Sequence, residues 1–194
     1  MSIANNNQTD VVGDVLAVAF LHYPVMDFAF EGESEAAQAR KLKIMFQCCA
    51  NAARLFDGTI QTEDKDGALL WLPGPKAPLG LWRELRADVA PHVPDKEVLQ
   101  YVTKQVNVKQ MGLIWLVGVE HKSQGKGYCR ILMERAMRTE MGTQGMTEFW
   151  LTTDTVVKAK IYERLGFHVM VERVIQSSGL TNWLMRKLEV PSSS

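Results

Sequence analysis

The feature of this 194-residue chain that most constrains its fold is an apolar run that leads into a glycine-rich turn. Residues 113–119 read LIWLVGV, and a continuous run of this kind is typical of a β-strand buried on both faces. The sequence HKSQGKGYC follows, with glycine at 125 and 127, and apolar residues then recur at helical spacing from Ile131. A strand, a glycine-rich turn and a helix in this order predict an α/β fold.

The turn is suited to binding an anion. Glycine lets the backbone approach a ligand closely, and the first N–H groups of a helix have no partner within the helix. We therefore predict a phosphate site here, with Lys126 adding a positive charge at its rim. Two nucleotide-binding fingerprints fail: G-x-G-x-x-G needs glycine where Arg130 stands, and a P-loop needs Ser or Thr where Gly127 follows Lys126.

Two separated motifs narrow the interpretation. Gln124, Gly127 and Cys129 occupy the fixed positions of the pattern Gln/Arg-x-x-Gly-x-Gly/Ala, and a Tyr-x-x-x-Gly-Phe segment begins at Tyr162. Both lie where the GNAT superfamily of acetyl-CoA-dependent N-acetyltransferases has them, so residues 110–175 resemble that superfamily. The resemblance implies an α/β (α+β) three-layer fold, in which a mixed, mostly antiparallel, twisted sheet carries helices on both faces.

Weaker similarities and some departures accompany this resemblance. Residues 20–24 and 68–73 resemble segments of a small-molecule branch of the superfamily. His121 stands where the family often has proline, and Thr155 stands where it often has an asparagine that contacts the cofactor. The family's usual first strand is hard to find before Asp10.

The N-terminal part of the chain is predicted to be helical. Apolar spacing indicates one helix up to Phe20, with Thr9 or Asp10 as its capping residue. A second helix is expected over residues 33–56, with Gly58 ending it.

The remaining elements follow from periodicity and breakers. A helix over residues 156–165 should end at Gly166 in a left-handed conformation, and one or two short helices are expected within residues 80–109. The predicted strands cover residues 58–61, 68–72, 113–119, 147–152, 167–174 and 182–190. We expect a single domain over residues 1–190 and a disordered tail over residues 191–194.

The resemblance assigns roles to the central segment. Backbone groups of Val117 and Val119 would pair with the pantetheine arm of acetyl-CoA as an added strand does. Tyr162 would act as the general acid that protonates the departing thiolate. The implied cofactor-binding residues are Val117, Gly118, Val119, Gln124, Gly125, Lys126, Gly127, Tyr128, Cys129 and Thr155.

An attacking amine must first lose a proton, so a general base is expected. Glu120 lies just past the apolar strand, and Asp154 and His22 are further candidates, but each also fits an ordinary surface or loop residue. Cys129 is interpreted as a small packing residue of the turn rather than a nucleophile. Five aromatic residues are candidates for the lining of an acceptor pocket, although core packing is the more common role for each. They are Phe28, Phe30, Trp71, Trp82 and Trp115.

Composition excludes several classes. Equal numbers of basic and acidic residues, 22 each, argue against a general nucleic-acid binder. Three cysteines without a C-x-x-C pair, together with four histidines, argue against a disulfide framework or a metal site. The sequence contains no secretory signal and no apolar run that could span a membrane, so a cytoplasmic protein is expected.

The expected function is acetyl transfer from acetyl-CoA to a primary amine of a small molecule. A non-catalytic acyl-CoA sensor and a protein or peptide N-acetyltransferase are the alternatives. The sequence does not identify the acceptor amine. A homodimer is an expectation from the resemblance alone, because many members of the superfamily form dimers.

Overall fold

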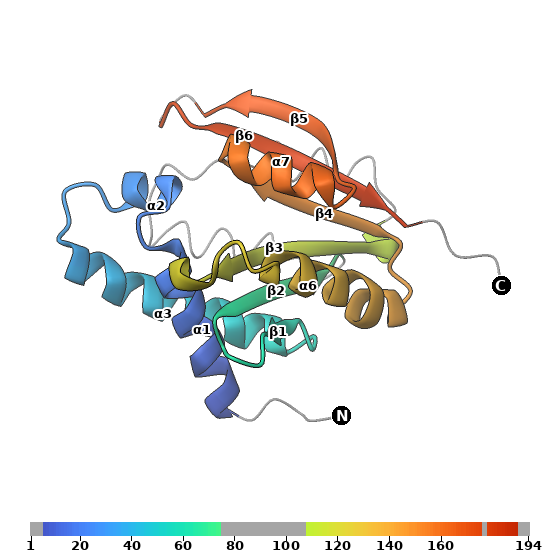
Figure 1. Ribbon diagram of the computed structural model, residues 1–194, viewed down its shortest axis with the longest axis horizontal. Coiled ribbons are helices and arrows are strands. Elements are labelled where there is room, and N and C mark those ends of the chain that lie inside the picture. The colour runs from blue at the N-terminus through green and yellow to red at the C-terminus, as the bar shows by residue number, and fades with distance from the viewer. Residues whose placement is uncertain (1–5, 75–107, 176–177, 190–194) are drawn as a thin grey trace.

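The computed structural model describes residues 6–74, 108–175 and 178–189. These residues form one six-stranded sheet in the order β1-β2-β3-β4-β6-β5, in which only the central β3–β4 pair is parallel (Figure 1). The strands are β1 (Thr59–Gln61), β2 (Gly67–Pro73), β3 (Met111–Val119), β4 (Glu148–Thr153), β5 (His168–Val174) and β6 (Thr181–Leu188). The predicted mixed, mostly antiparallel α/β sheet is confirmed.

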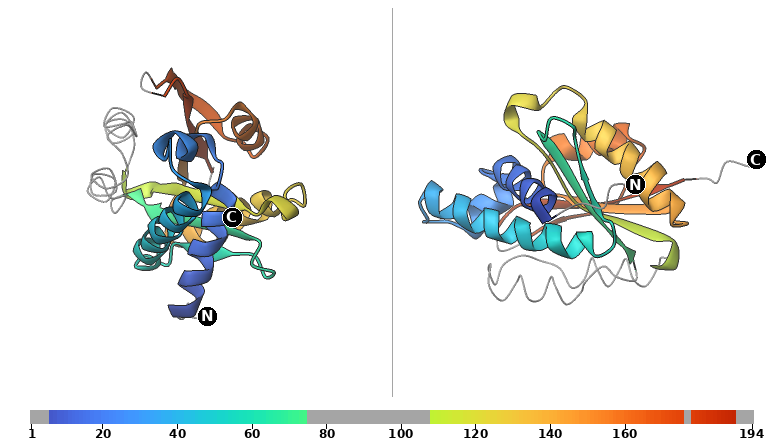
Figure 2. Two further views of the ribbon diagram at one scale, coloured as in Figure 1. Left: turned by 90° about the vertical axis from the view of Figure 1, so that its left-hand side faces the viewer. Right: turned by 90° about the horizontal axis from the view of Figure 1, so that it is seen from below.

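Helices cover both faces of this sheet, which gives the predicted three layers (Figure 2). The helical elements are α1 (Asn6–Phe20), α2 (Pro24–Ala29), α3 (Glu35–Arg54), α6 (Tyr128–Arg135) and α7 (Val156–Arg164). A π-helical segment, η4 (Ala136–Met141), continues α6, and short 3-10 turns stand at η2 (Val108–Gln110) and η3 (His121–Ser123).

Two hydrophobic cores lie on opposite faces of the sheet. On one face α1 and α3 pack over β2 and β3, around fully buried Leu16, Leu42 and Phe46. On the other face α6, η4 and α7 enclose Trp71 and Phe149. Because both faces of the central strands are covered, their near-continuous apolar sequence is explained.

The starts and ends of two helices differ from the predictions. Helix α1 begins at Asn6, so Thr9 and Asp10 lie inside the helix rather than at its cap. Polar residues are also tolerated in the first turn of a helix, because the N–H groups there have no partner within the helix. Gly58 does not supply the left-handed residue after α3, since Asp57 has φ 55° instead. A Cβ at Gly58 would lie 2.0 Å from the Trp71 carbonyl oxygen, so glycine is required there for a close approach.

The predicted elements of the second half agree closely with the structure. Helix α7 ends one residue earlier than expected, and Gly166 follows in the left-handed region with φ 87°. Before β1 the described residues contain helices alone, so the family's usual first strand is not found among them. The short helices expected within residues 80–109 fall almost wholly outside the described residues, as does the tail over 191–194.

Strand β3 contains a bulge where it pairs with β2. Leu70 lies opposite Leu116, whereas the next residue, Trp71, lies opposite Ile114, so Trp115 is the extra residue. The side chains of Trp115 and Leu116 both contact the core under α1 and α3. Beyond the bulge, Val117 and Val119 face the side of α6 and α7.

Candidate active site

The central strands β3 and β4 are parallel but pair over only three residues. The pairs are Met111 with Glu148, Gly112 with Phe149 and Leu113 with Trp150. Beyond them the strands diverge (Figure 1), and their facing backbone edges have no strand partner among the described residues. This separation of the two strands, widest toward Val119 and Thr153, is called the cleft below. An open strand edge presents unpaired N–H and C=O groups that an extended ligand can bind.

The glycine-rich turn leads from the end of β3 into α6. Gly125 and Gly127 have φ of 79° and 83°, and a Cβ at either position would meet no atom within 4 Å. Among the described residues, the N–H groups of residues 125–130 have no acceptor, and Ile131 is the first to donate, to the Gly127 carbonyl at 3.1 Å. The turn therefore presents a row of free donors at a helix N-terminus, as a phosphate site requires.

The hairpin turn between β1 and β2 holds the glycine-rich turn in place. Ser123 is fully buried and donates a hydrogen bond of 2.6 Å to Asp66, and the Tyr128 hydroxyl donates to Asp64. Lys122 contacts Asp66 at 2.9 Å. The hydrogen bond from Ser123, followed by that from Lys122, lowers the pKa of Asp66, so this carboxylate is ionised at neutral pH.

The three predicted β3 residues of the cofactor site differ in what they face. Val117 and Val119 pack toward α6, as a cofactor-facing position requires. Gly118 faces the opposite side of the sheet, where a Cβ would lie 2.7 Å from the Ala19 Cβ. Its glycine is therefore needed for the packing of α1. The Val119 carbonyl already accepts a hydrogen bond of 3.2 Å from the Gln124 amide.

Tyr162 lies on α7 in the core, 6% exposed and with its ring centre 6.2 Å from that of Phe167. Burial raises its pKa well above 10, so the phenol stays protonated at neutral pH. Burial also raises the pKa of Cys129 to about 11, which keeps this thiol neutral and unreactive. The interpretation of Cys129 as a packing residue agrees with this.

Comparisons with solved structures show which fold this is. The C-terminal condensation domain of Ebony, in complex with beta-alanyl-dopamine, aligns with a TM-score of 0.67 at 10% identity, over 95% of this chain and 96% of that one. A protein from Corynebacterium glutamicum, described as histone acetyltransferase HPA2 and related acetyltransferase, aligns with a TM-score of 0.66 at 16% identity. The alignment covers 98% of this chain and 96% of that one. Arylalkylamine N-acetyltransferase 2 from Aedes aegypti aligns with a TM-score of 0.62 at 15% identity, over 95% of this chain and 96% of that one. The chain has the GNAT fold. No family model and no curated protein matches it by sequence.

Within this GNAT fold, the three candidates for the general base lie in different surroundings. Glu120 forms an ion pair of 3.0 Å with Lys122, which ties it to the β1–β2 hairpin. His22 is exposed and lies 3.5 Å from Glu35 of α3. Asp154 alone of the three is buried, at the end of β4 where the cleft is widest.

The carboxylate of Asp154 lies beside the Tyr23 hydroxyl and the Val25 N–H. Burial raises its pKa, and the nearby Tyr23 hydroxyl and Val25 N–H weaken that rise. Both donors lie within hydrogen-bonding range, although neither Asp154 oxygen accepts a hydrogen bond of strict geometry. A buried carboxylate with a raised pKa is a competent proton acceptor.

Sequence reasoning missed Tyr23 and Lys158, which both lie close to Asp154. Lys158 lies one helical turn before Tyr162, and its Nζ lies 3.6 Å from the centre of the Tyr23 ring. Thr155 caps α7 by accepting a hydrogen bond from the Lys158 N–H at 3.4 Å, and its contact with the cofactor stays a prediction. The Lys158 position carries no motif, so only the fold reveals its surroundings.

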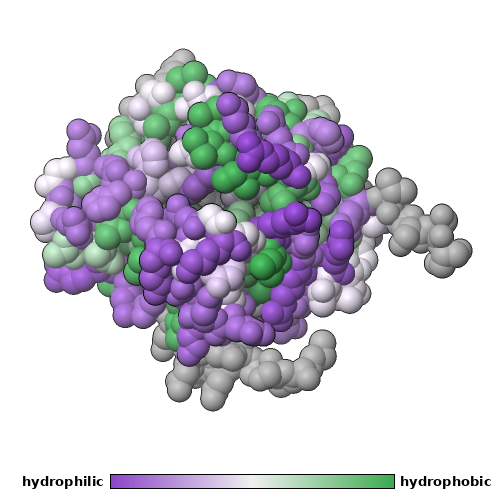
Figure 3. Space-filling model, in the orientation of Figure 1, coloured by the Kyte–Doolittle hydropathy of each residue, from purple (hydrophilic) through white to green (hydrophobic). Residues whose placement is uncertain are grey.

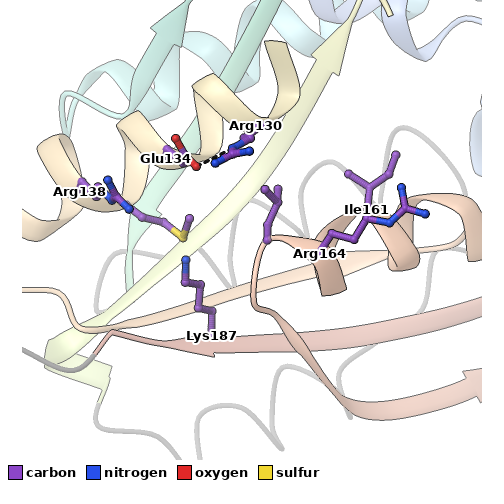
Figure 4. Close-up of a pocket in the computed structure, with 8 residues that line it drawn as sticks. Arg130, Glu134, Arg138, Ile161, Arg164 and Lys187 are labelled. Carbon is purple, nitrogen blue, oxygen red and sulfur yellow. Dashed lines mark hydrogen bonds and ion pairs between the residues drawn. The ribbon is translucent and has the colours of Figure 1, made fainter. Parts of the chain in front are cut away.

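A groove of about 370 Å³ between α6 and α7 was also missed (Figure 4). Arg130 and Glu134 form an ion pair of 2.8 Å on α6, and Lys187 points into the groove from β6. Its lining residues are Arg130, Glu134, Met137, Arg138, Ile161, Arg164, Leu165 and Lys187. Four cations against one carboxylate make the groove basic. The spacing of Arg130, Glu134 and Arg138 along one helix face was the available signal.

The surface beside this groove is locally apolar. Figure 3 shows a mostly hydrophilic face on which apolar side chains gather over α7, where Val156 and Val157 are 53% and 66% exposed. Among the aromatic acceptor-pocket candidates, Phe30, Trp71 and Trp115 are buried core residues, Phe28 is half-buried, and Trp82 lies outside the described residues. In the described part of the chain, none of the helices has the length and apolar character needed to cross a membrane.

Proposed function

We propose that this protein is an N-acetyltransferase that moves the acetyl group of acetyl-CoA to a primary amine of a small molecule. The observation that carries the proposal is the row of unpaired N–H groups at residues 125–130, placed beside the open edges of β3 and β4. Positive φ and open space at Gly125 and Gly127 form a cradle that a pyrophosphate fits and that a side chain would fill.

The proposed contacts with acetyl-CoA follow the cleft and the groove. The turn would hold the pyrophosphate, and the open edge of β3 around Val117 would pair with the pantetheine arm. The basic groove, which begins at Arg130 on the first turn of α6, would take the 3′-phosphate end of the nucleotide. Ile161 and Leu165 give the same groove an apolar wall for the adenine ring.

Tyr162 and Asp154 are the proposed acid and base. Bound acetyl-CoA supplies a thioester carbonyl that a neutral amine can attack directly. Asp154 would remove the proton from the incoming ammonium, for which its burial and raised pKa suit it. Tyr162, which stays protonated, would donate a proton to the leaving thiolate. Asp154 directly precedes Thr155, the cap of α7, and Tyr162 lies in the last turn of the same helix.

The wide end of the cleft favours a small acceptor. The connection between α1 and α2 places Phe20 and Tyr23 against Lys158 there, so side chains already occupy this end. Because a protein substrate needs an open groove in which to lay its chain, this enclosure supports a small-molecule amine over a protein or peptide.

The first test is calorimetric titration with acetyl-CoA of the wild type and of Gly127→Trp. The indole would fill the cradle, so we expect micromolar binding by the wild type to be lost in the variant. Gly145→Trp is the matched control, since Gly145 also has positive φ and open space around a missing Cβ but lies in the loop before β4. Both variants carry the same backbone strain, so equal binding by the two would refute the assignment of the turn.

Turnover is tested separately, with a panel of small amines and Tyr162→Phe. We expect acetyl-CoA consumption by the wild type and a fall in kcat of roughly 100-fold or more in the variant, a typical effect of losing a positioned acid. A folded protein that binds acetyl-CoA but turns over none of the amines would instead be an acyl-CoA sensor, and the transferase proposal would be wrong.

A further inference from the structure

Lys158 stands at the wide end of the cleft in an unusual position for a lysine. Its Nζ lies 3.6 Å from the centre of the Tyr23 ring and 5.3 Å from that of the Phe20 ring. The side chain is half-buried on the first turn of α7, one helical turn from Tyr162. A primary amine is therefore held against two aromatic faces at the place where the acetyl group is proposed to react.

The charged and titratable groups around Lys158 come from three directions. Asp154 faces it from the end of β4, Cys129 from α6, and Tyr23 from the α1–α2 connection. Burial lowers the pKa of Lys158 to about 8, although Asp154 and, after it, Cys129 act in the opposite direction. At pH 8 about half of such amines are neutral, against less than ~1% of ordinary exposed lysines.

We propose that Lys158 is an acyl acceptor within its own protein and takes the acetyl group from acetyl-CoA bound in the cleft. A neutral, enclosed amine beside a thioester is a nucleophile, because nothing further is needed to activate it. Proximity in a shared cleft makes the reaction effectively unimolecular. This inference rests on the proposed cofactor site and adds a modification site to it.

The step balances without any further reactant. The Nζ lone pair attacks the thioester carbonyl carbon, a C–N bond forms and the C–S bond breaks. The proton lost from Nζ passes to Asp154, and Tyr162 supplies a proton to the departing sulfur. The proton held by Asp154 then returns through solvent to Tyr162, which restores both groups. The products are acetylated Lys158 and the free thiol of CoA.

The experiment incubates the full chain with acetyl-CoA at pH 7, 8 and 9, and follows acetylation by intact mass and peptide mapping. We expect a gain of one acetyl group on Lys158, at a rate independent of protein concentration and suppressed by excess CoA. The rate should rise about fivefold from pH 7 to 8 and less than twofold from 8 to 9, whereas an ordinary exposed amine gains about tenfold per pH unit.

Two variants make the outcome decisive. Lys158→Arg should lose the fast modification yet still bind acetyl-CoA in calorimetry, and Lys160→Arg, which replaces an exposed lysine of the same helix, should keep it. If the wild type binds acetyl-CoA but Lys158 reacts no faster than exposed lysines, the self-acetylation proposal is wrong and the cofactor site stands. If the wild type does not bind acetyl-CoA, both proposals fail.

Discussion

Replacing Lys158 by methionine should stabilise the fold at pH 7. The pKa of this side chain falls from 10.5 to about 8 because burial disfavours its charged form. At 1.36 kcal/mol per pKa unit, that difference corresponds to a penalty of roughly 3 kcal/mol while the amine is charged. The cation–π attraction to the Tyr23 ring offsets about 0.5–2 kcal/mol of this penalty, but the lowered pKa indicates that desolvation is the larger effect. Because solvent still reaches part of the side chain, we expect a gain of about 1–3 kcal/mol.

The sign of the pH dependence follows from the two pKa values. Below pH 8 both the folded and the unfolded chain carry the proton, so the penalty is fully present. Between pH 8 and 10.5 the folded chain releases the proton while the unfolded chain keeps it, and wild-type stability should rise with pH. The advantage of Lys158→Met over the wild type should therefore shrink by about 2 kcal/mol between pH 7 and pH 9.5.

The assay is urea unfolding of wild type, Lys158→Met and Lys160→Met at both pH values, followed by circular dichroism. Lys160 is exposed on the same helix, so its variant controls for helix propensity and for net charge. Comparing the three proteins at the same pH cancels the contribution of the other titrating groups to the free energy of unfolding. An advantage that is absent at pH 7, or that is equal at the two pH values, would refute the placement of Lys158 in a desolvated site.

Three further predictions concern the turn, the groove and the core. Ser123→Ala removes the buried hydrogen bond to Asp66 and should weaken acetyl-CoA binding about tenfold, measured by calorimetry, with the fold intact by circular dichroism. Arg164→Gln should weaken binding of CoA several-fold but leave dephospho-CoA, which lacks the 3′-phosphate, unchanged; an equal loss for both ligands would contradict the groove assignment. Phe46→Ala should lower the free energy of unfolding by about 3–5 kcal/mol in urea titrations, because the ring is 1% exposed and packs 5.0 Å from the Phe20 ring.

Much of the fold was predictable because its signals are local. The apolar run at 113–119, the glycine at 127 and the Tyr-x-x-x-Gly-Phe segment each fix an element or a turn through short-range constraints, and all lie where expected. Gly58 shows where local reasoning fails. Its role is set by a carbonyl of β2, which is remote in sequence, rather than by the helix that precedes it.

The candidate site was predictable only where one segment supplies it. The anion-binding turn is contiguous, so sequence alone indicated it. Asp154, Tyr23 and Lys158 meet only because the α1–α2 connection folds over the end of β4, and this contact has no signature in any one segment. Gly118 faces α1, unlike the two valines with which the sequence grouped it, since a strand alternates its faces.

The bulge at Trp115 sets the phase of the strand that forms one wall of the cleft. In a regular strand Ile114, Leu116 and Gly118 would share a face, and Val117 and Val119 would point to α1. The extra residue shifts this alternation by one step, so the face toward the cleft carries valines and the face toward α1 carries the glycine. Deleting Trp115 would therefore remove the bulge and leave the facing of Val117, Gly118 and Val119 unchanged. Forcing the full strand into regular pairing with Trp115 retained would instead turn the two valines toward α1 and the glycine toward the cleft. The bulge thus sets which side of β3 lines the cleft and which side packs against α1.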